Sequence, residues 1–149
     1  MNLELYNTLH EIPGEELQLL YDFIINICPI LQDADIHIVG SVLSNTGFRD
    51  MDIAIYKTGL TEIGSNQIYH DLRVAIYQDK RFNGIFDFIV YPDPYNAECK
   101  QAHKNLPYFS LNEMKMYNTS FNEPVSEGVV ESMRTTFNEF REYVINKQK

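Results

Sequence analysis

The apolar run at residues 85–91 (IFDFIVY) constrains the fold more than any other feature of the sequence. Gly84 precedes it and Pro92-Asp93-Pro94 follows it, and residues of these types commonly bound a strand. We therefore predict a buried strand with Asp87 in its middle. Burying a lone carboxylate is costly unless the group is paired or bound to a metal ion. The fold should therefore supply a partner for Asp87.

The rest of the chain alternates between short apolar runs and helical patterns. Two further strands are predicted at Asp35–Val39 (DIHIV) and Met51–Tyr56 (MDIAIY), the second from its alternation. Residues 106–120 are ambiguous and fit a loop with a little strand or helix. Helices are predicted over residues 13–28, 66–80, 95–104 and about 125–147, with a brief turn at 42–45. This order indicates an α/β (α+β) fold, with a small mixed sheet, helices largely on one side, and a C-terminal helix.

Size and charge limit the classes of function. The chain has 149 residues, which suits a single domain, and its net charge of -9 argues against binding to duplex nucleic acid. No apolar run approaches the ~20 residues of a membrane helix, and the acidic N-terminus lacks the features of a signal peptide. We expect a cytoplasmic protein with no membrane partner. Two cysteines and four scattered histidines do not favour a zinc site.

A second acidic feature is Asp50-Met51-Asp52, at the start of a predicted strand. Residues i and i+2 of a strand share a face, so Asp50 and Asp52 should project together while Met51 faces the core. Two carboxylates held this close repel each other, and a divalent cation such as Mg²⁺ removes the conflict. If the strand of Asp87 lies alongside, at the usual ~4.8 Å, three carboxylates converge. The sequence thus predicts a metal site formed by Asp50, Asp52 and Asp87.

The turn at Gly40-Ser41 fits the same site. Glycine lets the backbone approach a phosphate closely, and the Ser41 hydroxyl with the following amides could hold the β- and γ-phosphates of a nucleotide. Among the basic residues, Arg49 is the best candidate for contacting the nucleotide, since it lies nearest the acidic pair in sequence. Gly40, Ser41 and Arg49 are therefore the predicted nucleotide-binding residues.

The order of these motifs resembles the signature of the DNA polymerase β-type nucleotidyltransferase superfamily. The motifs are Gly40-Ser41, a short spacer, Asp50-Met51-Asp52 and the later Asp87. The resemblance covers about residues 10–95 and is strongest to minimal stand-alone members. Two departures stand out: no Arg-Gly follows the Gly-Ser, and Phe48-Arg49 stands where Ser-Asp is usual.

The resemblance implies a reaction and a set of roles. Asp50 and Asp52 would bind two Mg²⁺ or Mn²⁺ ions, and Asp87 would bind the catalytic ion and help to activate the attacking hydroxyl. These three would be the catalytic residues, and a nucleotidyl group would pass from an NTP to a protein, a small molecule or an RNA end. Minimal members often act as antitoxins that modify a partner toxin, which makes a protein acceptor the first to test.

Each feature also has a simpler interpretation. Gly-Ser after a strand is usually only a turn, and Asp50 beside Arg49 could be a surface ion pair. Asp87 could face water from an edge strand. The alternative function is an inert, antitoxin-like binding module that grips a protein partner through a C-terminal helix at residues 125–145.

Overall fold

The computed structural model describes residues 15–39, 51–82, 86–93 and 107–118, with four further helical positions at 138, 139, 142 and 146. The predicted turn at 42–45 and helix at 95–104 lie outside the described residues. So does most of the predicted C-terminal helix.

The described strands form one mixed sheet of five strands in the order β3-β2-β1-β4-β5. Only β2 and β3 pair in parallel, and every other neighbouring pair in the described sheet is antiparallel. The strands are β1 (Asp35–Val39), β2 (Met51–Tyr56), β3 (Phe86–Tyr91), β4 (Pro107–Ser110) and β5 (Lys115–Asn118). The predicted α+β fold with a small mixed sheet is thereby confirmed, and the ambiguous segment at 106–120 contains a β4-β5 hairpin.

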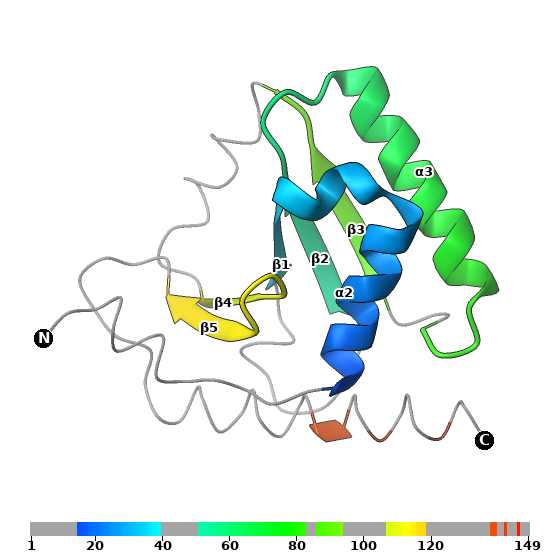
Figure 1. Cartoon of the computed structure of the whole chain (residues 1–149), viewed down its shortest axis with the longest axis vertical. Helices are drawn as coiled ribbons and strands as arrows, with labels where there is room; N and C mark the ends of the chain where they lie inside the picture. Colours follow the sequence, from blue (N-terminus) through cyan, green and yellow to red (C-terminus); the bar gives the residue numbers. More distant parts are fainter. Residues whose placement is uncertain are drawn as a thin grey trace, which may run out of the picture.

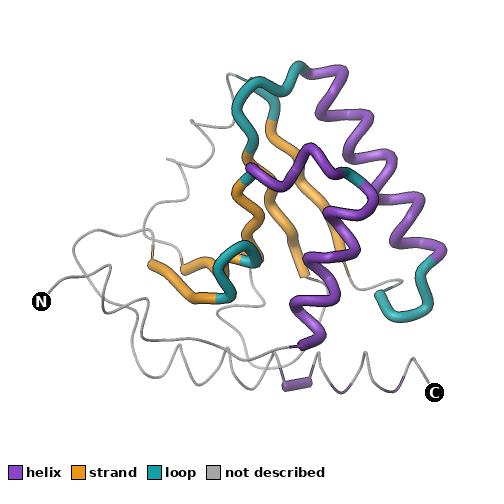
Figure 2. The backbone as a smooth tube through the Cα atoms, in the orientation of Figure 1, coloured by secondary structure: helices purple, strands orange, loops and turns teal. Residues whose placement is uncertain are grey.

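Helices α2 (Glu15–Ile27) and α3 (Glu62–Gln78) lie on the same side of this sheet (Figures 1 and 2). A 3₁₀ helix, η1 (Pro29–Asp33), follows α2 directly. Helix α3 begins four residues before the predicted start at residue 66. The reason is a cap, since the Thr61 hydroxyl accepts a hydrogen bond from the Gly64 amide at 3.0 Å. As the connection between the parallel strands β2 and β3, α3 has the usual role of a crossover helix.

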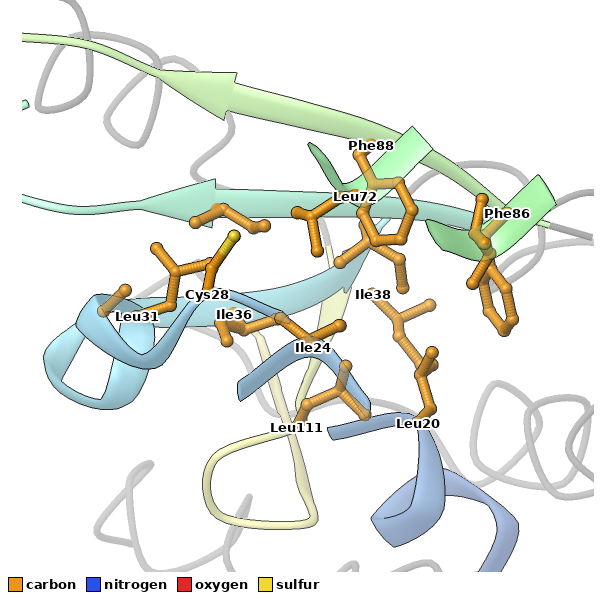
Figure 3. Packing of buried hydrophobic residues seen from close by; sticks show 14 of the residues in the cluster. Leu20, Ile24, Cys28, Leu31, Ile36, Ile38, Leu72, Phe86, Phe88 and Leu111 are labelled. Carbon is orange, nitrogen blue, oxygen red and sulfur yellow. The ribbon is translucent and has the colours of Figure 1, made fainter. Parts of the chain in front are cut away.

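One face of the sheet, here called the helix face, packs against both helices. It is formed by Ile36 and Ile38 of β1, Met51, Ile53 and Ile55 of β2, Phe86 and Phe88 of β3, and Phe109 of β4. Leu20 and Ile24 of α2 and Leu72 of α3 contact this face, as Figure 3 shows. The apolar stripes of the helices and the alternating strands therefore close one hydrophobic core.

The opposite face, here called the second face, carries the alternate residues of the same strands. They are Asp35, His37 and Val39 of β1, Asp52, Ala54 and Tyr56 of β2, Asp87, Ile89 and Tyr91 of β3, and Tyr108 and Ser110 of β4. Aromatic rings stack along part of it, with ring centroids 4.2 Å apart for His37 and Tyr108 and 5.0 Å apart for Tyr56 and Tyr91. This stacking helps to explain why Tyr56 and His37 are buried although α2 and α3 lie on the other side of the sheet (Figure 1).

Within the described residues, no helix has both the length and the apolar character needed to cross a membrane.

Candidate metal and nucleotide site

Asp52 and Asp87 lie directly side by side on adjacent parallel strands. In the register of β2 and β3, Asp52 pairs with Asp87, one step after Met51 pairs with Phe86. Since paired residues of neighbouring strands point to the same face, both carboxylates project from the second face, with backbones ~4.8 Å apart. The adjacency of these two strands, on which the predicted metal site depends, is therefore present.

The position of Asp87 differs from the prediction in one respect. β3 lies at an edge of the described sheet, and the Asp87 side chain is 54% exposed. The prediction that Asp87 is buried was wrong, and the alternative interpretation, that Asp87 faces water from an edge strand, is confirmed. β3 alternates, so that Phe86 and Phe88 face the core while Asp87 and Ile89 are exposed. Water therefore reaches Asp87 more freely than Asp52, which is partly buried.

Arg73 of α3 contacts one member of this carboxylate pair, Asp87. Its Nη1 lies 3.3 Å from Asp87 Oδ1, and its guanidinium carbon lies 5.6 Å from the centroid of the Tyr69 ring. Sequence reasoning favours Arg49 among the basic residues and does not single out Arg73. No local pattern identifies Arg73, because its proximity to Asp87 arises from the crossover that returns α3 along β3.

Two other basic residues form ion pairs elsewhere. Lys57 Nζ lies 2.6 Å from Asp33 Oδ1, and this hydrogen bond lowers the pKa of Asp33 below its ordinary value. Arg81 Nη2 lies 3.0 Å from Asp79 Oδ2. Burial alone would raise the pKa of Asp79, but the hydrogen bonds from Arg81 outweigh it, so this pKa is lowered. Of these three ion pairs, that of Arg73 is the one at the candidate site.

The remaining predicted site residues, Gly40, Ser41, Arg49 and Asp50, lie outside the described residues. Their roles stay predictions. Within the described ranges, no group of three or more His, Cys, Asp or Glu side chains is placed to hold a metal ion. The described part of the site therefore consists of Asp52, Asp87 and the arginine that contacts it.

The two described carboxylates fit a hard divalent cation in their chemistry. Mg²⁺ prefers oxygen ligands and is usually bound by one or two carboxylates together with substrate phosphates and water. Asp52 and Asp87 offer only oxygen donors, on one face and in register. Like charges directly opposite each other on neighbouring strands repel, and a bound cation would reduce this repulsion.

A separate polar cleft of about 370 Å³ lies at the other end of the second face. Asp35, His37, Tyr108 and Glu113 are among its lining residues. Asp35 pairs with Tyr56, whereas Val39, at the opposite end of β1, pairs with Asp52. Asp35 is thus four strand residues, or ~13 Å, from the level of the carboxylate pair, whereas His37 is two residues from it.

Comparisons of this chain with protein-family models, curated proteins and solved structures gave no match.

Proposed function

We propose that this protein transfers a nucleotidyl group from an NTP to a hydroxyl acceptor, with a divalent metal ion held by Asp52 and Asp87. The observation that carries the proposal is the register of β2 and β3, which sets these two carboxylates side by side on the face that α2 and α3 leave uncovered. A paired set of acidic residues on this face suits a metal-bound triphosphate, because Mg²⁺ is commonly held between one or two carboxylates and the phosphates of a substrate.

In this reaction the acceptor oxygen bonds to the α-phosphorus while the bond to the bridging oxygen of the β-phosphate breaks. Pyrophosphate leaves, and the hydroxyl proton passes to a carboxylate or to water. A bound Mg²⁺ would lower the pKa of the acceptor hydroxyl and stabilise charge on the phosphoryl oxygens. Asp87 is the better candidate for orienting the acceptor hydroxyl, because it is exposed at the edge strand. Asp52, which is partly buried between β1 and β3, is the more fixed ligand.

The predicted partners of this pair are Asp50, as a third carboxylate, and Gly40-Ser41 with Arg49, on the triphosphate. Asp50 directly precedes β2 in the sequence. These assignments rest on the motif spacing and on the resemblance to polymerase β-type nucleotidyltransferases.

The test is label transfer from each of the four NTPs, labelled at the α-phosphate, to candidate proteins, small molecules and RNA ends in the presence of Mg²⁺. Asp52→Asn and Asp87→Asn should each reduce transfer at least about a hundredfold, as expected when a group that stabilises the transition state is lost. Asp22→Asn is the matched control, because Asp22 is an exposed carboxylate on α2 that accepts a hydrogen bond from Gln18. Equal transfer by the Asp52 variant and the control would refute the proposal.

A second candidate function is an inert module that binds a protein partner. The ion pair between Arg73 and Asp87 supports the absence of catalysis in such a module, since it balances the charge of Asp87 without a metal ion. Calorimetry separates the two candidates. The enzyme should bind an NTP with Mg²⁺ and lose this binding in Asp52→Asn, whereas the module should bind no nucleotide while folding normally.

A further inference from the structure

We propose that Arg73 is a positioning residue that holds Asp87 in the metal-free protein and competes with the divalent cation for that carboxylate. The guanidinium would then set how readily the site takes up metal. This inference rests on the proposed function, because it requires a metal site at Asp52 and Asp87.

Arg73 is held in place by the packing of α3 against β3. The Ser65 hydroxyl of α3 donates a hydrogen bond of 2.7 Å to the Val90 carbonyl of β3, and Ser65 is buried. About two turns further along α3, Arg73 reaches Asp87 at the other end of β3. Because β3 is the edge strand of the described sheet, a side chain from the helix face can reach around it to the second face.

The guanidinium is also supported by Tyr69, which lies one turn before Arg73 on the same helix. The guanidinium carbon lies 5.6 Å from the centre of this ring, within the range of a cation–π contact. Tyr69 thus favours the orientation of Arg73 in which it meets Asp87. The arginine is therefore more restricted than its 53% exposure alone suggests.

Arg73 and a divalent cation would act on the same group. Arg73 contacts Asp87 Oδ1, so a metal ion that uses this oxygen must displace the guanidinium or lie close to its positive charge. Both arrangements weaken metal binding, the first by competition and the second by repulsion. In the absence of metal, the same contact offsets the repulsion between Asp87 and its register partner Asp52.

The expected size of the effect is modest. Arg73 and Asp87 are both about half exposed and share one contact at 3.3 Å, and exposed ion pairs of this kind are weak. Removing the competing charge should therefore tighten metal binding by about two- to fivefold. If Arg73 only contributes to the surface of α3, removing its charge should not change the metal affinity.

The experiment measures Mn²⁺ binding to the full chain without nucleotide, by electron paramagnetic resonance of the free ion. Arg73→Gln should bind Mn²⁺ about two- to fivefold more tightly than the wild type. Arg73→Lys, which keeps the charge, should stay close to the wild type. Arg81→Gln is the matched control and should leave binding unchanged, because Arg81 pairs with Asp79 instead. Thermal melts establish that each variant is folded.

Asp87→Asn separates failure of this inference from failure of the proposed function. It should weaken Mn²⁺ binding, and adding Arg73→Gln to it should then have no further effect. If Asp87→Asn leaves Mn²⁺ binding unchanged, no metal uses Asp87, and both proposals fall. If Asp87→Asn weakens binding but Arg73→Gln alone binds Mn²⁺ no more tightly than the wild type, the role of Arg73 is refuted while the metal site stands.

Discussion

On the helix face, Met51, Ile53 and Ile55 of β2 are fully buried under α2 and α3. On the second face the same strand carries Asp52, which is partly exposed, beside the buried Ala54 and Tyr56. β3 repeats the contrast, with Phe86 and Phe88 in the core and Asp87 and Ile89 exposed. Two strands with one alternating pattern thus present a continuous apolar surface on one side and a mixed acidic and aromatic surface on the other.

The contrast shows how stability and a site can be separated within one sheet. A shift of one residue between β2 and β3 would turn phenylalanines of β3 toward the second face, so the helix face fixes the register. Once the register is fixed by the core, Asp52 and Asp87 are adjacent without contributing to the hydrophobic packing themselves. The second face can therefore carry charged residues at little cost to the core.

The largest effect on stability that would test this comparison is expected from substituting Phe88, with its neighbour Ile89 in β3 as the control. Phe88→Ala should lower the free energy of unfolding by about 3–5 kcal/mol, because Phe88 is 2% exposed within the core. Ile89→Ala is the matched control on the second face, where Ile89 is 36% exposed, and it should cost about 1 kcal/mol or less. Urea unfolding measures both. Similar losses for the two variants would show that the second face stabilises the fold as much as the core does.

A smaller effect is expected at Asn112, which is exposed in the turn after β4 yet hydrogen-bonds to the backbone at the start of β1. Its Oδ1 accepts from the Ile36 amide and its Nδ2 donates to the Ala34 carbonyl, each at 2.8 Å. Asn112→Ala should cost about 1–3 kcal/mol in thermal or urea unfolding, because it leaves these backbone groups without their partner.

Two further variants sharpen the interpretation of Asn112. Asn112→Asp keeps the acceptor for Ile36 but sets a carboxylate oxygen against the Ala34 carbonyl, and these two acceptors repel each other, so its melting temperature should also lie below that of the wild type. Glu113→Gln is the control for an exposed residue of the same turn. If Asn112→Ala is as stable as Glu113→Gln, the two hydrogen bonds of Asn112 do not contribute measurably to the stability of the fold.

Much of this arrangement could be predicted from the sequence, because it depends on local patterns. The bounds of β1 and β2 match the predicted Asp35–Val39 and Met51–Tyr56, the first marked by a short apolar run before Gly40-Ser41 and the second by alternation. The adjacency of Asp52 and Asp87, which the predicted metal site required, is present as well, in a pair of parallel strands joined by a helix. The start of α3 was less well predicted, because the Thr61 cap places it at Glu62 instead of residue 66.

The features that the sequence does not predict depend on the position of a strand within the sheet. The exposure of Asp87 follows from β3 being an edge strand in the described sheet, and the run at 85–91 does not encode that position. The contact between Arg73 and Asp87 depends on the path of the α3 crossover. The roles predicted for Gly40, Ser41, Arg49 and Asp50 stay predictions, because these residues lie outside the described ranges.

The smallest expected effect concerns Tyr108, at the β4 end of the second face. Burial, together with the negative charges of Glu113 and Asp35, raises the pKa of Tyr108 to about 12. In the unfolded chain the pKa of a tyrosine is about 10, so the unfolded state releases this proton first as the pH rises. The folded state should therefore lose stability between pH ~10 and ~12, with no effect at neutral pH.

Tyr108→Phe tests how far this part of the second face is shielded from water. The variant should lose less stability than the wild type above pH ~10, because it has no phenol to ionise. The difference in phenolate absorbance between the two proteins isolates one tyrosine among ten and should titrate near pH 12. Glu113→Gln should move this titration to lower pH, since it removes one of the charges that oppose ionisation. A midpoint near pH ~10 in the wild type would instead mean that water reaches the phenol freely. The stacking of His37 on Tyr108 would then not shield the phenol from water.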